Sequence, residues 1–246
     1  MRGYLGRNLH YIGCSFLRAV SSEYRAHTDL FVLPYCDRVD FQSGIGNGFF
    51  VLYGLVRSLK PQVIVETGSA RGKSTCALAL ACRQNERGMV YAIDPHTPNK
   101  WSEYHTSGYN LDFLKDRIAD YSIGDWCQIL QSTSAEVAKS WDKPIDMLWI
   151  DGDHTYDGVK LDFELFAPFL KPTAMVVFHD SMWEYRRDSP HYRDDLGVPK
   201  FLNELKLKGY QSITLPCLPG MTLLQPILGG FDFVPAELPK HEVFVN

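Results

Sequence analysis

Helix-like and strand-like hydrophobic patterns alternate along most of this chain. Phe49, Leu52, Val56 and Leu59 share one face of a predicted helix, and Pro61 marks its end. Short apolar or β-branched runs follow, and each is typical of a buried parallel strand. The predicted strands cover residues 63–65, 89–93, 126–130, 145–150 and 174–178. Further helices are predicted over residues 75–82, 111–121, 132–139 and 156–170.

The last part of the pattern predicts a helix over residues 198–207 and two late strands, 210–215 and 221–224. Pro219 and Gly220 separate these strands, so they are expected to form an antiparallel hairpin at a sheet edge. Strands that alternate with helices imply a doubly wound α/β fold. The sequence therefore predicts a mainly parallel sheet with a late antiparallel edge hairpin.

This pattern divides the 246 residues into three parts. Residues 44–228 are expected to form the α/β domain. Residues 1–43 have no clear period and are interpreted as an extension, either a lid over the site or an arm in an oligomer. Residues 229–246 are rich in proline and aromatic residues and are interpreted as a C-terminal tail.

Composition and charge exclude several classes of protein. The formal net charge of −4 argues against a nucleic-acid surface, which is usually basic over a whole face. The six cysteines include no CxxC pair and match no zinc template. No apolar stretch reaches the ~18 residues that span a bilayer, and no signal peptide is recognised. We therefore expect a cytoplasmic protein with reduced thiols and neither nucleic-acid nor membrane partners.

Chemistry-bearing residues directly follow the predicted strands. Glu66 follows the first strand, Asp94 the second, Asp151 the fourth, and His179 and Asp180 the fifth. Doubly wound sheets bind ligands at the carboxyl ends of their strands. These side chains are therefore expected to lie along one edge of the sheet, although they are scattered in the sequence.

The segment Glu66–Ser74 is a glycine-rich turn between a strand and a helix. Gly68 permits a tight turn, Gly72 permits close approach of a ligand, and the first N–H groups of the helix favour an anion. Asp94 is placed to hold ribose hydroxyls. The two glycines are four residues apart, so the segment is neither a nucleoside-triphosphate loop nor a G-x-G-x-x-G motif. A turn without a ligand is the alternative, and Asp94 argues against it.

Several motifs together resemble one enzyme family. Val65–Thr75 is similar to the first motif of class I S-adenosylmethionine-dependent methyltransferases. Ile150–Tyr156 narrows the resemblance to the metal-dependent O-methyltransferases, near macrocin O-methyltransferase and the cephalosporin hydroxylase group. The remaining matching segments are Lys171–Pro172, Val177–Asp180, Gly197–Pro199 and Lys208–Tyr210. The resemblance covers about residues 44–225 and implies a Rossmann-like methyltransferase fold.

The resemblance also implies roles for individual residues. It implies that the cofactor S-adenosylmethionine is bound by Glu66, Thr67, Gly68, Ser69, Gly72, Ser74, Asp94, Gln131, Ser132 and Asp151. In this set Asp94 would hold the ribose, while Gln131 and Ser132 would lie near the adenine. Asp151 and Asp180, with His179 as a further candidate, would bind Mg²⁺. His154 would be the general base, and Asp151 would share the catalytic role.

Elementary chemistry supports these residue types. An alcohol is a weak nucleophile near neutral pH, so a cation that acidifies its hydroxyl and a histidine that accepts the proton would both help. Mg²⁺ prefers carboxylate oxygens. Two alternatives stay open: Asp153 could replace Asp151 as ligand or cap the next helix, and His154 could only fix its loop. His179 could bind the metal or hydrogen-bond Asp180.

The expected function is methylation of a hydroxyl on a small molecule, such as a sugar, a glycosylated natural product or a phenol. One alternative is a metal-dependent enzyme of the same fold that transfers no methyl group. The other is a non-catalytic protein that retains the cofactor site. A homo-oligomer is expected because relatives in this family often bury N-terminal arms at interfaces.

Overall fold

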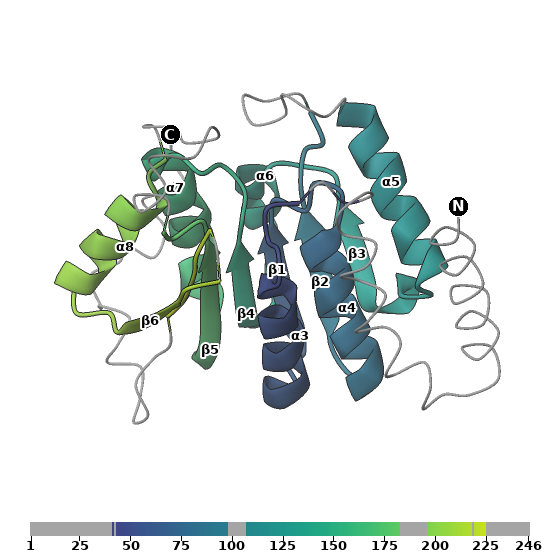
Figure 1. Ribbon diagram of the computed structural model, residues 1–246, viewed down its shortest axis with the longest axis horizontal. Coiled ribbons are helices and arrows are strands. Elements are labelled where there is room, and N and C mark those ends of the chain that lie inside the picture. Colours follow the sequence, from purple (N-terminus) through teal and green to yellow (C-terminus); the bar gives the residue numbers. More distant parts are fainter. Residues whose placement is uncertain (1–40, 42, 98–106, 183–195, 218, 225–246) are drawn as a thin grey trace, which may run out of the picture. The chain divides into compact units, whose positions relative to one another are not determined.

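The computed structural model describes residues 41, 43–97, 107–182, 196–217 and 219–224 (Figure 1). The chain divides into two compact units, Met1–Gln42 and Ser43–Asn246. All described elements below belong to the second unit. The predicted tail 229–246 and almost all of the predicted extension 1–43 lie outside the described residues, so their roles stay predictions.

A seven-stranded sheet forms the centre of the second unit, with strand order β3-β2-β1-β4-β5-β7-β6. The five strands β3, β2, β1, β4 and β5 are parallel, and β7 pairs antiparallel with both β5 and β6. The strands are β1 (Val63–Thr67), β2 (Met89–Ile93), β3 (Cys127–Leu130), β4 (Ile145–Ile150), β5 (Leu170–His179), β6 (Ser212–Leu215) and β7 (Met221–Leu224). The predicted fold class, including the edge hairpin, is confirmed.

Helices cover both faces of the sheet. They are α3 (Gly48–Leu59), α4 (Lys73–Asn85), α5 (Ser107–Asp120), α6 (Ser134–Lys139), α7 (Tyr156–Phe166) and α8 (Val198–Leu207), with 3₁₀ turns at Gly124–Trp126 and Ala167–Phe169. Helix α3 packs on α4, and α7 packs on both α6 and α8. The chain runs from β1 to β2 and β3 on one side of the sheet and then returns to β4 and β5 on the other side of β1. Because crossovers between parallel strands are right-handed, this reversal places the α3–α4 pair and the α6–α7–α8 group on opposite faces. None of the described helices is both long and apolar enough to cross a membrane.

Several predicted boundaries differ from the structure. Strand β1 continues through Glu66 and Thr67, which were predicted to lie in the turn, because both residues pair with β2 and β4. Helix α7 ends at Phe166, four residues early, and a 3₁₀ turn containing Pro168 follows, since proline lacks an N–H. Strand β5 begins at Leu170, four residues before the predicted start.

Among the described residues, a hydrophobic core lies between the β1-β4-β5 part of the sheet and helices α7 and α8. Phe163 and Phe166 of α7 and Phe201 of α8 are almost fully buried there, against Phe178 of β5. The rings of Phe163 and Phe201 meet at a centroid distance of 5.6 Å. This packing fixes the carboxyl ends of β4 and β5, where the predicted acidic residues lie.

Candidate active site

The turn between β1 and α4 depends on glycines at positive φ. Gly68 and Gly72 have φ angles of 84° and 83°. The Gly68 N–H donates to the Ile93 carbonyl at 2.9 Å, and the Gly72 N–H donates to the Ser69 carbonyl at 2.7 Å. A Cβ on Gly68 would lie 2.1 Å from the Asp151 carbonyl oxygen. The prediction that a side chain would block this turn is confirmed, and the turn packs directly on the residue after β4.

The second glycine of the turn makes room for a helix. A Cβ on Gly72 would lie 2.2 Å from the Leu114 side chain of α5. Beside it, the Arg71 guanidinium lies 3.9 Å from the Phe113 ring centroid, which also belongs to α5. The structure thus explains Gly72 by packing of α5 on the turn, whereas the sequence suggested close approach of a ligand.

Glu66 is fully buried and contacts the beginning of α4. Its two carboxyl oxygens accept hydrogen bonds from the Ser74 hydroxyl at 2.5 Å and the Thr75 hydroxyl at 2.6 Å. Burial raises the pKa of Glu66 to about 8, although these hydrogen bonds oppose the shift. Glu66 and Ser74, both predicted to bind the cofactor, therefore bind each other and join β1 to α4.

Asp94 lies at the carboxyl end of β2 and joins two loops. One carboxylate oxygen accepts the Ala70 N–H at 2.8 Å, and the other accepts the His96 N–H at 2.7 Å. Its side chain is 17% exposed. Each carboxylate oxygen has a second lone pair, so Asp94 retains the capacity to accept hydrogen bonds from two ribose hydroxyls.

Three polar side chains near this turn are buried without hydrogen-bond partners among the described residues. They are the Ser69 hydroxyl, both ring nitrogens of His96 and the Asn110 side-chain carbonyl oxygen. Burial lowers the pKa of His96 and favours its neutral form, even though Asp94 opposes this. Buried polar groups usually find a partner, so these atoms fit a polar ligand such as a nucleoside with an amino-acid tail.

Gln131 and Ser132 directly follow β3, beside Asp94. Strands β2 and β3 pair in register at Ile93 and Leu130, and the Leu130 carbonyl accepts both the Asp94 N–H at 3.2 Å and the Ser132 N–H at 2.8 Å. The structure therefore brings the residues predicted for ribose and adenine to adjacent strand ends.

A second group of residues lies at the ends of β4 and β5. Ligand atoms of Asp151, His154 and Asp180 all lie within 4.8 Å of one another. His154 Nδ1 is 2.8 Å from Asp180 Oδ2, while His179 Nδ1 is 2.8 Å from Asp151 Oδ1 and 3.3 Å from Asp180 Oδ2. We call these four residues the acid–histidine cluster. Two carboxylates and an imidazole are a donor set that fits a divalent cation.

Attraction between the carboxylates and the imidazoles outweighs burial in setting the pKa values of the two histidines and of Asp180. Burial lowers the pKa of His154, but Asp180 and Asp151 raise it, and the net pKa lies above its ordinary value. The same balance raises the pKa of His179 well above its usual range. Burial raises the pKa of Asp180, yet the two histidines outweigh this effect and lower it. Without a bound cation, His154 and His179 therefore favour their protonated forms and Asp180 favours its charged form.

Asp153 has a structural role in the next turn. Its carboxylate accepts the Thr155 N–H at 2.9 Å, and the Thr155 hydroxyl accepts the Gly158 N–H at 3.1 Å, which caps α7. Asp153 is also outside the group of potential metal ligands found among the described residues. The geometry thus favours Asp151 over Asp153 as a metal ligand.

Sequence reasoning did not single out Asp162 of α7. Burial raises its pKa to about 6, although the nearby Ser134 and Thr67 hydroxyls oppose that shift. A Cβ on Gly152 would lie 2.7 Å from an Asp162 carboxyl oxygen, so Asp162 supports the turn that carries the cluster. Its position between the buried residues Val159 and Phe166 at helical spacing was the signal available in the sequence.

Comparison with known proteins identifies the class. Residues 65–181 match a family model described as a methyltransferase domain. The doubly wound sheet, the turn after β1 and the acid after β2 agree with that match. Residues 65–181 are therefore similar to methyltransferase domains, and the fold is that of class I S-adenosylmethionine-dependent O-methyltransferases, which confirms the resemblance seen in the motifs at this level.

Solved structures of methyltransferases share this fold. The O-methyltransferase TomG from Streptomyces achromogenes, solved with S-adenosylmethionine, is 18% identical with a TM-score of 0.59 over 80% of this chain and 88% of its own. The Podospora anserina methyltransferase PaMTH1, solved with S-adenosylhomocysteine, is 15% identical with a TM-score of 0.60 over 82% of this chain and 87% of its own.

A relative by sequence is the uncharacterized protein y4gI of Sinorhizobium fredii. It is 27% identical over an alignment of 157 positions, and the match covers 59% of this chain. The chain spans only 17% of that relative's length. This likeness therefore bears on the shared domain alone.

Proposed function

We propose that this protein transfers the methyl group of S-adenosylmethionine to a hydroxyl group of a small molecule, with the help of a divalent cation. One observation carries the proposal: the cofactor-type turn and the acid–histidine cluster meet at a single sheet edge. Gly68 packs on the Asp151 backbone, and the Asp151 N–H donates to the Thr67 carbonyl at 3.0 Å. Two chemically different half-sites are thus in direct contact.

The cofactor half would be formed by the ends of β1, β2 and β3. Asp94 would hold the ribose, and Gln131 and Ser132 would lie beside the adenine. The buried, unpartnered Ser69 hydroxyl would bind the polar amino-acid part. Two of the similar structures contain S-adenosylmethionine or its demethylated product, which supports this choice of cofactor.

The acid–histidine cluster would form the other half. Asp151 and Asp180 would bind the cation, with Mg²⁺ as the first candidate, and a bound cation would lower the pKa of the acceptor hydroxyl. Asp180 Oδ2 lies 2.8 Å from His154 Nδ1, and this contact would orient the ring so that the neutral imidazole can accept the proton of the acceptor hydroxyl. His179, between the two carboxylates, would position them.

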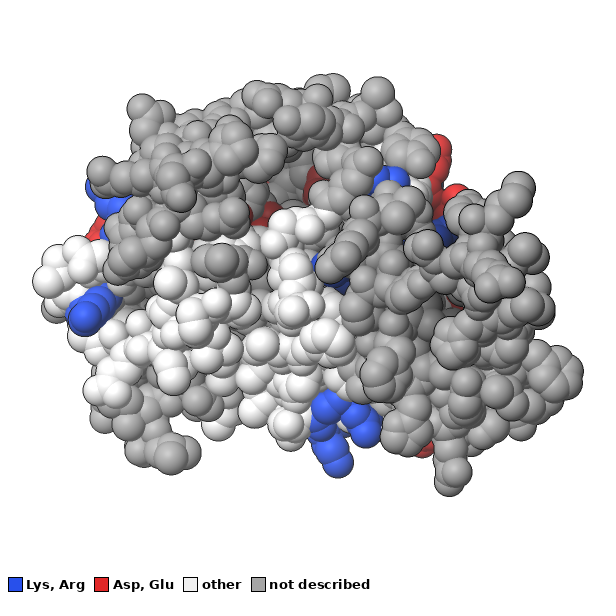
Figure 2. Space-filling model, viewed as in Figure 1, with Lys and Arg blue, Asp and Glu red and all other residues white. Residues whose placement is uncertain are grey.

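Figure 2 shows acidic atoms at the upper edge of the molecule, some of them in a hollow, in the view in which the parallel strands of Figure 1 point upward. A positively charged sulfonium and a divalent cation would both be attracted to such an edge. The acceptor would be a neutral or anionic compound with a free hydroxyl, such as a sugar, a glycosylated natural product or a phenol.

Calorimetric titration with S-adenosylmethionine, with and without MgCl₂, tests the cofactor half. We expect Asp94→Ala to weaken binding by about ten- to a hundredfold, because two hydrogen bonds are lost. Asp125→Ala is the matched control, since Asp125 is exposed and precedes β3 at the opposite sheet edge. No binding by the wild-type protein under either condition would refute the proposed function.

An acceptor screen tests the reaction. Sugars, glycosides and phenols would be incubated with the protein and S-adenosylmethionine, and release of S-adenosylhomocysteine would be measured with Mg²⁺, with Mn²⁺ and with a chelator. We expect cation-dependent release with both metals, because the carboxylate oxygens of Asp151 and Asp180 suit Mn²⁺ as well as Mg²⁺. Cofactor binding with no transfer to any acceptor class would favour a protein that binds the cofactor without methylating a hydroxyl.

A further inference from the structure

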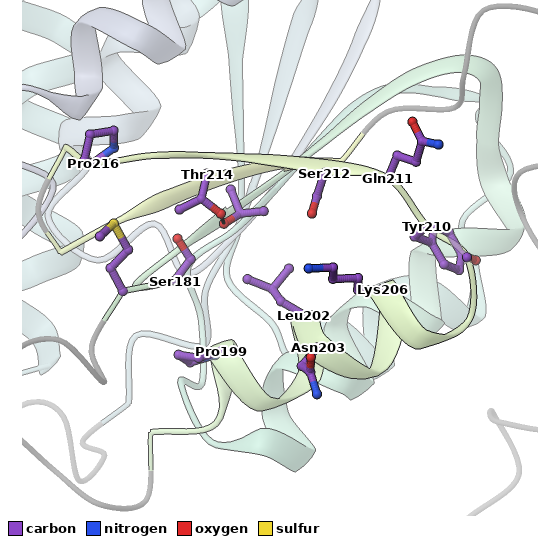
Figure 3. A pocket seen from close by; sticks show the side chains of 13 residues that line it. Ser181, Pro199, Leu202, Asn203, Lys206, Tyr210, Gln211, Ser212, Thr214 and Pro216 are labelled. Carbon is purple, nitrogen blue, oxygen red and sulfur yellow. Dashed lines mark hydrogen bonds between the residues drawn. The ribbon is translucent and has the colours of Figure 1, made fainter.

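A polar groove of about 880 Å³ lies between α8 and the β6–β7 hairpin (Figure 3). Its volume falls within the usual range for ligand sites, ~300–1,000 Å³. The polar side chains that line it include Ser181, Asn203, Lys206, Gln211, Ser212 and Thr214. None of the residues of the cofactor half belongs to this lining, so the groove is a separate space.

One end of the groove is lined by Ser181, which directly follows Asp180 of the acid–histidine cluster in the chain. Backbone hydrogen bonds hold this end, since the Met182 N–H donates to the Pro219 carbonyl at 2.9 Å. The groove then extends along α8 toward Gly209 and Tyr210, away from the cluster (Figure 3).

Ser181 supplies an independent sign of a ligand. Its side-chain hydroxyl is buried, at 7% residue exposure, and has no hydrogen-bond partner among the described residues. An unsatisfied buried hydroxyl costs free energy unless a ligand or ordered water completes its hydrogen bonds. The hydroxyl lies at the end of the groove where a bound molecule would also be near Asp180.

The chemistry of the lining indicates the kind of ligand. Hydroxyl and amide side chains alternate with apolar ones such as Leu202 along it, and the polar groups both donate and accept hydrogen bonds. Among the described residues of the lining, Lys206 is the one that carries a charge, and Figure 3 shows its ammonium group extending into the space beside Ser212. A ligand with many hydroxyls and a negative charge would match this surface.

We infer that this groove is the acceptor subsite and binds an acidic sugar, either free or as part of a glycoside, with one hydroxyl directed toward Asp180. Ser181 binds a hydroxyl at the inner end, and Lys206 pairs with the acidic group farther out. This inference rests on the proposed function, because only a methyl acceptor needs to reach the cluster.

Saturation-transfer NMR with two probes tests the inference: sodium D-glucuronate and neutral methyl β-D-glucopyranoside. The samples contain the full chain, MgCl₂ and S-adenosylhomocysteine, so that no turnover occurs. We expect both sugars to bind, with glucuronate about three- to fivefold tighter because its hydrogen bond to Lys206 is charge-assisted.

Two pairs of variants locate the binding. Ser212→Trp fills the groove, whereas Ile213→Trp adds the same bulk to the neighbouring residue of β6, which is 61% exposed and does not line the groove. Lys206→Gln removes the positive charge of the groove. Its control, Lys200→Gln, removes another positive charge from α8, which lies over the Tyr156 ring of α7 instead of in the groove. Ser212→Trp should abolish both sugar signals, and Lys206→Gln should abolish only the preference for glucuronate. The control variants should resemble wild type.

Titration of the same samples with S-adenosylmethionine separates this inference from the proposed function. If wild type binds the cofactor but neither sugar, or if Ser212→Trp leaves sugar binding unchanged, the groove assignment is wrong and the proposed function is unaffected. If wild type binds no cofactor, the proposed function fails. Loss of sugar binding in Ser212→Trp would still assign the groove as a sugar site.

Discussion

The contact between Gly68 and Asp151 makes a strong prediction for a single added methyl group. In Gly68→Ala, the new Cβ would lie 2.1 Å from the Asp151 carbonyl oxygen and 2.6 Å from the Gly152 Cα. Both neighbours are backbone atoms, so no side-chain rotation relieves the clash. In a close-packed interior the two turns must separate by about 1 Å.

Two effects contribute to the cost. An alanine at a φ angle of 84° adopts a left-handed conformation that costs about 1–2 kcal/mol. Separation of the turns also strains the hydrogen bonds from the Gly68 N–H to Ile93 and from the Asp151 N–H to Thr67, each worth about 1 kcal/mol. We therefore expect Gly68→Ala to lower the free energy of unfolding by roughly 2–4 kcal/mol.

Gly54→Ala is the matched control. Gly54 lies within α3 and a Cβ there meets no atom within 4 Å, so this substitution should stabilise the protein by about 0.5–1 kcal/mol. Urea unfolding measures both effects, and calorimetry measures S-adenosylmethionine affinity, which should fall at least about tenfold in Gly68→Ala only. Wild-type stability together with wild-type affinity in Gly68→Ala would refute the reasoning about this contact.

Three further substitutions test other parts of the structure. Burial raises the pKa of Glu66 from 4.5 to about 8, so the folded protein retains a proton that the unfolded chain loses, and stability should fall as pH rises through this window. Glu66→Gln should flatten that decline in urea unfolding, and an unchanged decline would contradict the assignment. The Asp146 carboxylate accepts hydrogen bonds from the Gln62 and Val63 N–H groups and from the Lys171 ammonium. Asp146→Ala should therefore lower the free energy of unfolding in urea by about 1–3 kcal/mol without changing cofactor affinity. The exposed control Asp142→Ala should leave both unchanged. Asp180→Asn should lower cation-dependent release of S-adenosylhomocysteine by about a hundredfold or more while cofactor affinity is retained, and undiminished stimulation by the cation would remove Asp180 from the cation site.

The position of the candidate site was predictable because it depends on topology. Residues that follow parallel strands gather at one edge of the sheet whatever their separation in sequence. Asp94, Asp151 and Asp180 therefore came together as expected, at the ends of β2, β4 and β5. Gly68 was predictable for a similar reason, since a tight strand-to-helix turn restricts the local backbone.

Side-chain partners were less predictable because they depend on packing between distant elements. Glu66 belongs to the expected motif, yet its partners are hydroxyls of α4. Gly72 faces Leu114 of a helix that begins more than thirty residues later. His179 approaches Asp151 across 28 positions of the sequence, and no periodicity specifies that distance. In the sequence Asp162 resembles an ordinary exposed polar residue of a helix, and only the packing of α7 on the sheet shows that it is buried.

The order of the strands also constrains how the two substrates would approach. The residues proposed for the cofactor follow β1, β2 and β3, which form one side of the sheet. The acid–histidine cluster follows β4 and β5 on the other side of the point where the strand order reverses. A methyl acceptor must contact the cluster without displacing the cofactor, so it would approach from the β5 side. There β7 and β6 continue the sheet in the antiparallel direction and, together with α8, form the polar groove that ends at Ser181.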